Sequence, residues 1–201
     1  RKLVSCKIVK TIKKIKDCNS KSLHDIMKKK RCKMETIQIR RSIRKYINKP
    51  LDKEAITSIL QAAMQAPSAR NQQPWHFLVV QDQEKIKEYA KQTTNAKFLE
   101  TAPCIIIFLT DKKNLKTEAM YPQDLSAAIE NALLQAASLK IGSCWCGTYP
   151  NPERMNIVSK EFQIPSRFEP FAVVGFGYPS EEEAFHHVDR FDESRIHYEK
   201  I

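Results

Sequence analysis

The chain has 201 residues, of which 42% are hydrophobic, and this is enough for one domain with a core of its own. The chain has 34 basic and 23 acidic side chains, and residues 1–33 hold 13 of the basic and 2 of the acidic ones. Residues 34–201 therefore have 21 basic and 21 acidic side chains. The net charge of +11 therefore belongs to the first 33 residues, and the neutral remainder lacks the basic surface of a nucleic-acid-binding domain.

Residues 1–33, the basic leader, differ from the rest in composition. Apolar residues recur there at roughly helical spacing, so a basic amphipathic helix on an anionic surface is one interpretation. The leader has neither the apolar stretch of a secretory signal nor the length of a membrane span, and it has no aromatic residue to stack on a base. We expect a leader outside the fold and a single domain from 34 to 201, without nucleic-acid or membrane partners. An arm that binds nucleic acid or a membrane is the alternative.

Hydrophobic periodicity predicts alternating helices and strands after the leader. Asp52 is a good N-cap for a helix with one apolar face that ends before Pro67. The run CIIIFL is apolar on both faces, as in a buried central strand. The predicted elements are a helix that follows Asp52, a strand at 76–80, a polar helix at 82–93 and the strand at 104–109.

The longest predicted helix runs from Gln123 to Ile141 and is apolar around much of its circumference. Such a helix needs two surfaces to cover it, either in the centre of a core or at a subunit interface. Gly142 is expected to cap its C-terminus. A strand at 143–147, a helix at about 152–162 and a strand at 171–177 follow, which gives a mixed α and β chain without a readable sheet topology.

Six cysteines divide evenly between the leader and the domain, and none belongs to a CxxC pair. We expect Cys144 and Cys146 to point to opposite sides of a strand, which with the absence of metal-ligand spacing among the histidines predicts no metal site. Reduced thiols are typical of a cytoplasmic protein, and we expect that location. There is also no phosphate-binding GxxxxGK[ST] loop and no G-x-S-x-G nucleophile.

Four polar stretches remain as candidates for chemistry. In IRRSIRKY (39–46), at least two of the arginines could converge on one anion, although a solvated helix face is the alternative. APSARNQQPWHF (66–77) is unusually rich in amides and hydroxyls around a tryptophan. GSCWCGTYP (142–150) has small residues that let backbone N–H groups approach a flat ligand. HVDRFDESRIHYE (187–199) carries two more arginines, or is an exposed charged tail.

Four motifs follow one another along the chain: R-R-S-x-R, A-P-S-x-x-N-x-Q-P-W, an Ala-rich helix that ends in G-S-C-W, and P-F-x-V-V-G-x-G-Y-P. Together and in this order they resemble the motifs of the FMN-dependent nitroreductase family. The resemblance covers about residues 37–198. It implies an α+β fold, a three-layer sandwich with a central, mainly antiparallel sheet flanked by helices. It also implies an intertwined homodimer with two FMN sites at the interface.

Each stretch then acquires an expected role toward the cofactor. Four residues near the start would hold the phosphate, the ribityl chain and the N1/O2 edge of FMN, and Arg190 would close on the phosphate. Three residues of the second stretch, with Gln73 nearby, would lie on the ring held by the other subunit. Three residues of the third would line the far side of the ring, with a backbone N–H toward N5. The four residues near the start are Arg40, Arg41, Ser42 and Arg44. The three residues of the second stretch are Pro67, Ser68 and Asn71, and the three of the third are Trp145, Cys146 and Gly147.

The resemblance implies an NAD(P)H-dependent oxidoreductase that passes hydride from NADH or NADPH through N5 to nitroaromatics, quinones or similar acceptors in a ping-pong reaction. No side-chain acid or base is required, so no catalytic residue is named. Only a dozen residues, DKKNLKTEAMYP, precede the long helix where larger members have helical insertions, which predicts a short lid and an open site. The alternatives are a non-catalytic flavin-binding or sensor protein and a flavin-fragmenting or reductively dehalogenating relative.

Overall fold

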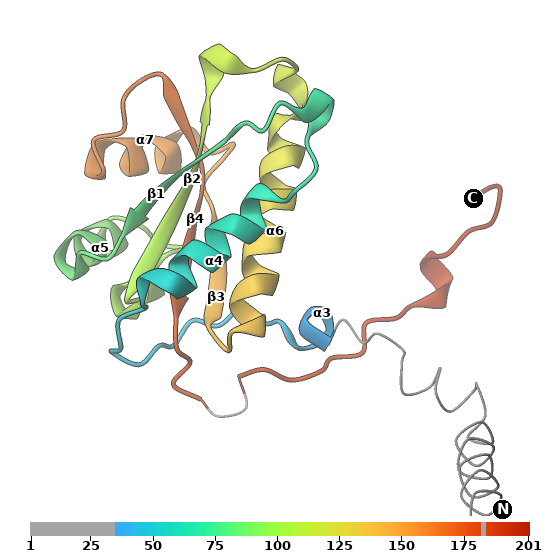
Figure 1. The fold of residues 1–201 in the computed structure, drawn as a ribbon, viewed down its shortest axis with the longest axis horizontal. Helices are drawn as coiled ribbons and strands as arrows, with labels where there is room; N and C mark the ends of the chain where they lie inside the picture. Colours follow the sequence, from blue (N-terminus) through green and yellow to red (C-terminus); the bar gives the residue numbers. More distant parts are fainter. Residues whose placement is uncertain (1–34, 182–183) are drawn as a thin grey trace, which may run out of the picture. The chain divides into compact units, whose positions relative to one another are not determined.

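Within residues 35–181 and 184–201, which the computed structural model describes, four strands form one sheet in the order β1-β2-β4-β3 (Figure 1). All three pairings are antiparallel, which confirms the predicted sheet. β2 and β4 lie in the middle and are buried along most of their length, as the apolar run at 104–109 predicts. The strands are β1 (Trp75–Val80), β2 (Cys104–Asp111), β3 (Gly142–Gly147) and β4 (Phe168–Gly177).

Helices cover both faces of the sheet and give the expected three-layer α+β sandwich (Figure 1). α4 and α6 pack together on one face, and α5 and α7 lie on the other. The helices are α3 (Glu35–Ile39), α4 (Lys53–Met64), α5 (Gln83–Lys91), α6 (Tyr121–Ser138) and α7 (Pro152–Glu161). The 3₁₀ turns are η1 (Ala69–Asn71), η2 (Lys97–Thr101), η3 (Lys112–Asn114), η4 (Glu118–Met120) and η5 (Glu193–Arg195). None of the helices in the described part of the chain is long and apolar enough to cross a membrane.

Side-chain caps fix where three of these helices begin. The Asp52 carboxylate accepts a hydrogen bond from the Ala55 N–H at 2.6 Å, as the sequence predicts. Asp82 caps α5 and Asn151 caps α7 in the same way. Each such cap stabilises its helix by roughly 1 kcal/mol, because it satisfies a backbone donor that has no partner within the helix.

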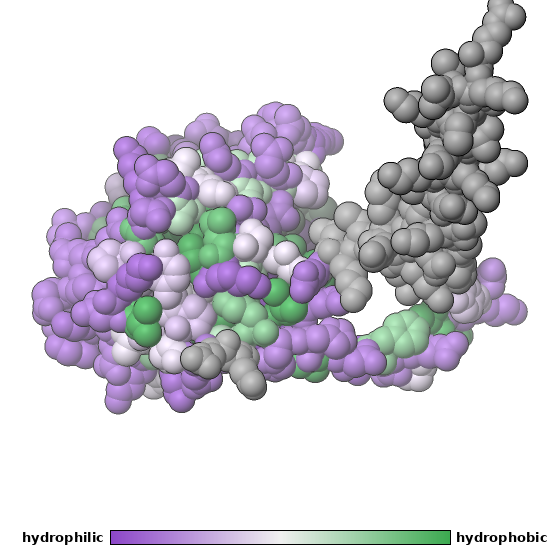
Figure 2. Space-filling model, turned by 60° about the horizontal axis from the view of Figure 1, so that its bottom comes forward, coloured by the Kyte–Doolittle hydropathy of each residue, from purple (hydrophilic) through white to green (hydrophobic). Residues whose placement is uncertain are grey.

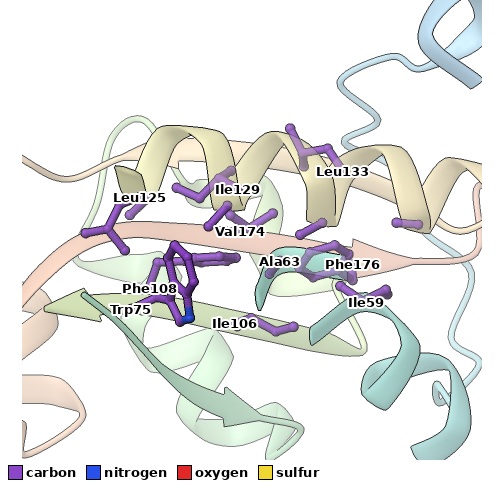
Figure 3. Close-up of a cluster of buried hydrophobic side chains, with 14 of the residues drawn as sticks. Ile59, Ala63, Trp75, Ile106, Phe108, Leu125, Ile129, Leu133, Val174 and Phe176 are labelled. Atoms are coloured by element: carbon purple, nitrogen blue, oxygen red, sulfur yellow. The ribbon is translucent and has the colours of Figure 1, made fainter. Parts of the chain in front are cut away.

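The larger hydrophobic core lies between the sheet and the α4–α6 layer (Figure 3). Leu125, Ile129 and Leu133 project from successive turns of α6 onto the sheet and α4. They meet Ile59 and Ala63 of α4 and Ile106, Phe108, Val174 and Phe176 of the two central strands. Full burial of one such aliphatic or aromatic side chain stabilises the fold by about 1.5–3 kcal/mol, so this layer fixes α6 against the sheet.

The end of α6 differs from the prediction. The helix ends at Ser138 rather than at Ile141, and Lys140, with φ of 58°, takes the left-handed conformation that closes it. Gly142 is the first residue of β3 and not a helix cap. A Cβ at Gly142 would lie 2.9 Å from Cγ2 of Ile43, so the glycine is needed because the segment before Lys45 packs directly on β3.

Candidate functional site

Residues 40–46, the arginine segment, run along the start of β3. Ser42 forms a parallel bridge with Ser143, and the Ile43 N–H donates to the Ser143 carbonyl at 2.9 Å. Tyr46 bridges to Pro179 beyond the end of β4. The segment is therefore extended, and the alternative of a solvated helix face is wrong. The helix α3 ends at Ile39, so Arg40, Arg41 and Arg44 all follow it.

Four arginines gather around this segment with few acidic partners. Nε of Arg40 lies 3.2 Å from the Glu130 carboxylate of α6. Arg41 donates to two nearby backbone carbonyls, but its Nε is buried without a hydrogen-bond partner. Burial and the positive charges of Arg190 and Arg40 lower the pKa of the Arg41 guanidinium. An anion bound here would relieve both the unpaired donor and the repulsion.

A cavity of about 360 Å³ opens beside the arginine segment. Arg44 and Lys45 contribute cations to its wall, and Lys45 pairs with Glu181 at 2.9 Å on the exposed rim. The lining residues are Arg41, Ser42, Ile43, Arg44, Lys45, Pro179, Glu181, Ala184 and His186. Three cations against one carboxylate, together with the Ser42 hydroxyl, fit a phosphate group.

β3 is an edge strand, and every second residue presents its backbone groups to the open side. The Ser143 carbonyl accepts from the arginine segment, and the Gly147 carbonyl accepts from Nη1 of Arg154 at 3.1 Å. The backbone groups of successive residues in an antiparallel strand point alternately to its two sides. The N–H and C=O of Trp145 therefore also point away from β4, whereas Cys146 pairs with Val173 of β4. The outward amides at 145 and 147 are therefore the ones available to a flat ligand.

The side chains of this strand lie on both faces of the sheet. Trp145 is half-buried and packs on Phe171, with ring centroids 6.3 Å apart. Cys146 is buried in the smaller core against α5 and α7. Cys144 lies on the same face as Cys146. The prediction that the two sulfurs point to opposite sides was wrong, because residues two apart in a strand share a face.

Residues 66–77, the amide loop, hold an unusual backbone. Arg70, Asn71 and Gln73 have φ of 51°, 50° and 46°, a region that residues other than glycine seldom occupy. The Ser68 hydroxyl accepts from the Gln73 N–H at 3.0 Å. Asn71 and Gln73 are exposed, so their side chains face away from their own chain's core. Strain of this kind is characteristic of ligand-contacting loops.

Asp124 and Gln72, which the sequence analysis missed, hold the amide loop in this shape. The buried Asp124 carboxylate of α6 accepts from the Ala69 N–H at 2.9 Å and from Nε2 of Gln72 at 2.6 Å. Oε1 of Gln72 accepts from the N–H groups of Lys116 and Thr117. This loop clamp ties the amide loop to α6 and to the short segment before it. A carboxylate on the apolar side of a helix was the available signal, because such a group is seldom buried without partners.

Within one chain the arginine segment and the amide loop do not meet. In Figure 1 the amide loop lies at the N-terminal end of α6, and the arginine segment (blue) runs past the opposite end of the sheet. The loop clamp involves the first turn of α6, whereas the arginine segment pairs with the start of β3. Pro67, Ser68, Asn71 and Gln73 are therefore apart from the arginines, while Trp145, Cys146 and Gly147 lie on the strand that the arginines flank.

The segment between β2 and α6 contains only η3 and η4, two single-turn 3₁₀ helices. Among the residues that the structure describes, no three His, Cys, Asp or Glu side chains come together to hold a metal ion.

Known proteins resemble this chain in sequence and in fold. The model of the nitroreductase family matches residues 37–94 and 88–178. A protein of Archaeoglobus fulgidus, provisionally named NADH dehydrogenase/NAD(P)H nitroreductase, is 45% identical over 83% of this chain and 97% of its own.

Two solved structures are also similar. One, from Clostridium acetobutylicum and provisionally named NADH oxidase, has 45% identity and a TM-score of 0.80 over 83% of this chain and 99% of its own. The other is from Desulfovibrio desulfuricans, provisionally named a nitroreductase and solved in complex with FMN. It has 28% identity and a TM-score of 0.71 over 84% of this chain and 96% of its own. The chain belongs to the nitroreductase family, which confirms the resemblance seen in the motifs.

Proposed function

We propose that the protein is an FMN-dependent oxidoreductase that uses NADH or NADPH to reduce nitroaromatics, quinones or similar acceptors in a ping-pong reaction. The observation that carries the proposal is the buried, unpartnered Nε of Arg41 within a cluster of arginines beside an open strand edge. The relatives add support, because one carries NAD(P)H nitroreductase in its name and another was solved with FMN. Three free thiols among the described residues favour a cytoplasmic location, which is part of the proposal.

The arginine segment would hold the phosphate end of the cofactor. Arg41 and Ser42 line the cavity with donors, and Arg190 adds a charge close to Arg41. Arg40 would donate hydrogen bonds to the phosphate when its guanidinium leaves Glu130 or bonds to both groups. Arg44 is exposed next to Ser42, where its charge would favour an anionic N1/O2 edge.

The β3 edge would hold the ring. FMN supplies hydride acceptance from NAD(P)H and donation to the second substrate at its N5 atom. A Cβ at Gly147 would meet no atom within 4 Å, so the space over this residue is open to a planar group. A backbone N–H at this position would polarise N5, and the neighbouring Trp145 and Cys146 would complete the wall.

A second copy of the chain would complete each site. The amide loop presents Asn71 and Gln73 outward, yet it lies away from the arginine segment of its own chain. Apolar side chains also reach the surface, and Figure 2 shows such residues among polar ones on one face. The large exposed ones are Ile37, Ile47, Met64, Leu139, Tyr149, Val188, Phe191, Ile196, Tyr198 and Ile201. We infer an intertwined homodimer with an interface above about 2,000 Å², the range of permanent interfaces.

The test is anaerobic addition of NADH or NADPH to the FMN-loaded protein, followed by a nitroaromatic or a quinone. Rapid loss of the yellow colour and its return with the acceptor support the proposal, and initial rates at varied concentrations should give the parallel lines of a ping-pong reaction. A flavin that stays oxidised contradicts it and favours the non-catalytic binding protein. The mass of the recovered flavin tests the flavin-fragmenting alternative. Release of iodide from an iodotyrosine tests the reductively dehalogenating one.

A further inference from the structure

Arg154 is a cation at the outer edge of β3 to which the proposed function gives no role. It belongs to the first turn of α7, and its Nη1 donates to the Gly147 carbonyl at 3.1 Å. Gly147 is the exposed last residue of β3, and its carbonyl points away from β4. The guanidinium therefore lies on the open side of the strand, beside the residue that would face the ring.

The turn between β3 and α7 holds this contact in place. The Asn151 side chain caps α7 by accepting from the Arg154 N–H at 3.0 Å, and the Asn151 N–H donates to the Thr148 carbonyl. The N–H groups of Thr148 and Tyr149 both donate to the Phe171 carbonyl of β4. These bonds tie the turn to the sheet and to the helix, so the fold fixes where the Arg154 side chain begins.

The charge of Arg154 has no acidic counterpart nearby. Among the described residues, no carboxylate forms an ion pair with it, whereas Lys45 of the arginine segment pairs with Glu181. The side chain is also only partly exposed. A partly buried cation without a carboxylate partner acts on its surroundings more strongly than a fully solvated one.

Two cations thus lie at opposite ends of the strand edge along which the ring would be bound. Ser42, two residues before Arg44, bridges to Ser143 at the start of β3. Arg154 bonds to Gly147 at its end. The rise along a strand separates Ser143 from Gly147 by about 13 Å. In the proposed site Arg44 is near the N1/O2 edge, so Arg154 is at the end where the Gly147 N–H would face N5.

We propose that Arg154 raises the reduction potential of FMN by placing a positive charge beside Gly147, at the N5 end of the ring. In the first half-reaction NADH or NADPH gives up one hydride, which is two electrons and one proton, and its nicotinamide becomes positively charged. The negative charge that the hydride carries passes to the ring. A fixed cation near N5 stabilises this charge and has little effect on the neutral oxidised ring. The inference rests on the proposed function, because it requires FMN at the β3 edge.

A purely structural role of Arg154 would give a different result. The midpoint potential of a bound cofactor depends on the ratio of two dissociation constants, those of its oxidised and its reduced form. Disorder of the strand end at Gly147 would weaken both forms by the same factor and leave the potential unchanged. Loss of a charge near N5 would weaken the reduced form more, and the potential would fall. The potential therefore separates the two roles without a measurement of turnover.

The expected size follows from the partial exposure of the side chain. One charge several ångströms away, at an effective dielectric between those of a protein surface and of water, changes an equilibrium constant by roughly three- to tenfold. A tenfold change in a two-electron couple is about 30 mV, so Arg154→Gln should lower the potential by about 15–30 mV. Arg154→Lys keeps the charge and should retain most of the wild-type potential.

The experiment is a titration of the FMN-loaded full chain with dithionite, in the presence of a reference dye and at fixed pH and ionic strength. Asn95→Ala is the first control, because Asn95 is an uncharged donor to the same Gly147 carbonyl, at 3.5 Å. Lys160→Gln is the second, because it removes a cation from the last turn of α7, about 9 Å further along the helix. Both controls should keep the wild-type potential, whereas Arg154→Gln should lower it.

An unchanged potential in Arg154→Gln overturns the proposal. A fall of the same size in Asn95→Ala or in Arg154→Lys overturns it as well, because the effect would then come from the carbonyl contact and not from the charge. Since dithionite supplies the electrons, bound FMN that NADH and NADPH fail to reduce would contradict the proposed function and leave the effect of Arg154 standing. A chain that binds no FMN would contradict both.

Discussion

The arginine segment and the amide loop are both rich in polar groups but are built in opposite ways. The arginine segment is an extended chain held by a few backbone bonds, and its cations exceed the acidic partners around them. In the amide loop, by contrast, the polar groups of Gln72 and Ser68 bond within the chain and leave Asn71 and Gln73 exposed. The first region has more cations than acidic side chains, and the second presents side chains outward from a rigid frame.

This difference indicates how each site is divided between two chains. A segment with unpaired donors is suited to receive a charged ligand. A strained loop that an internal carboxylate holds is suited to present a fixed surface to a neighbour. The arginine segment and the amide loop lie at opposite ends of the folded domain. In the proposed dimer, each chain therefore supplies the arginine segment of one site and the amide loop of the other.

Removal of the loop clamp should have the largest effect. Asp124→Ala takes away two hydrogen bonds to a buried carboxylate, so we expect about 3 kcal/mol less stability and a Tm lower by about 6–12 °C. FMN binding should weaken below that Tm, because the amide loop loses its frame. Ser126→Ala, which removes a hydroxyl bond on the same helix, is the control and should shift Tm by at most a few degrees. Wild-type flavin affinity in folded Asp124→Ala would show that the clamp serves stability alone.

Arg40→Ala tests the arginine segment. Loss of a hydrogen bond to a charged phosphate weakens FMN binding by about 1.5–3 kcal/mol, or roughly ten- to a hundred-fold, measured by fluorescence titration. The matched variant is Glu130→Gln, which removes the carboxylate that Arg40 pairs with and should leave FMN affinity equal or higher. If both variants weaken binding equally, Arg40 acts through its contact with α6 and not on the phosphate.

Some of this organisation was readable from the sequence because it is local. Asp52 and the apolar run at 104–109 specify a helix start and a buried strand through capping and periodicity alone. The role of Gly142 was missed because it depends on how closely Ile43 approaches β3. The left-handed turn at Lys140 was missed because glycine is the usual residue in that conformation. Asp124 and Gln72 were missed because their partners are about fifty residues apart in the chain.

The leader should have the smallest effect. The charge excess of the chain is confined to residues 1–33, so a chain that begins at Met34 should keep its FMN content and turnover within about twofold. Absorbance of the purified protein and its rate with NAD(P)H and a nitroaromatic measure both. A loss of bound FMN on this truncation would place the leader in the function of the domain.

The central claim, that one site takes its phosphate donors from one chain and its ring contacts from the other, is tested by mixing two inactive variants. Arg44→Ala and Asn71→Ala are unfolded together in equal amounts and refolded. In a mixed dimer one site carries both lesions and the other carries neither, and half of the dimers are mixed, so about a quarter of wild-type activity should return. No activity above the sum of the separate variants, or a stable FMN-loaded monomer by mass measurement, would contradict the account.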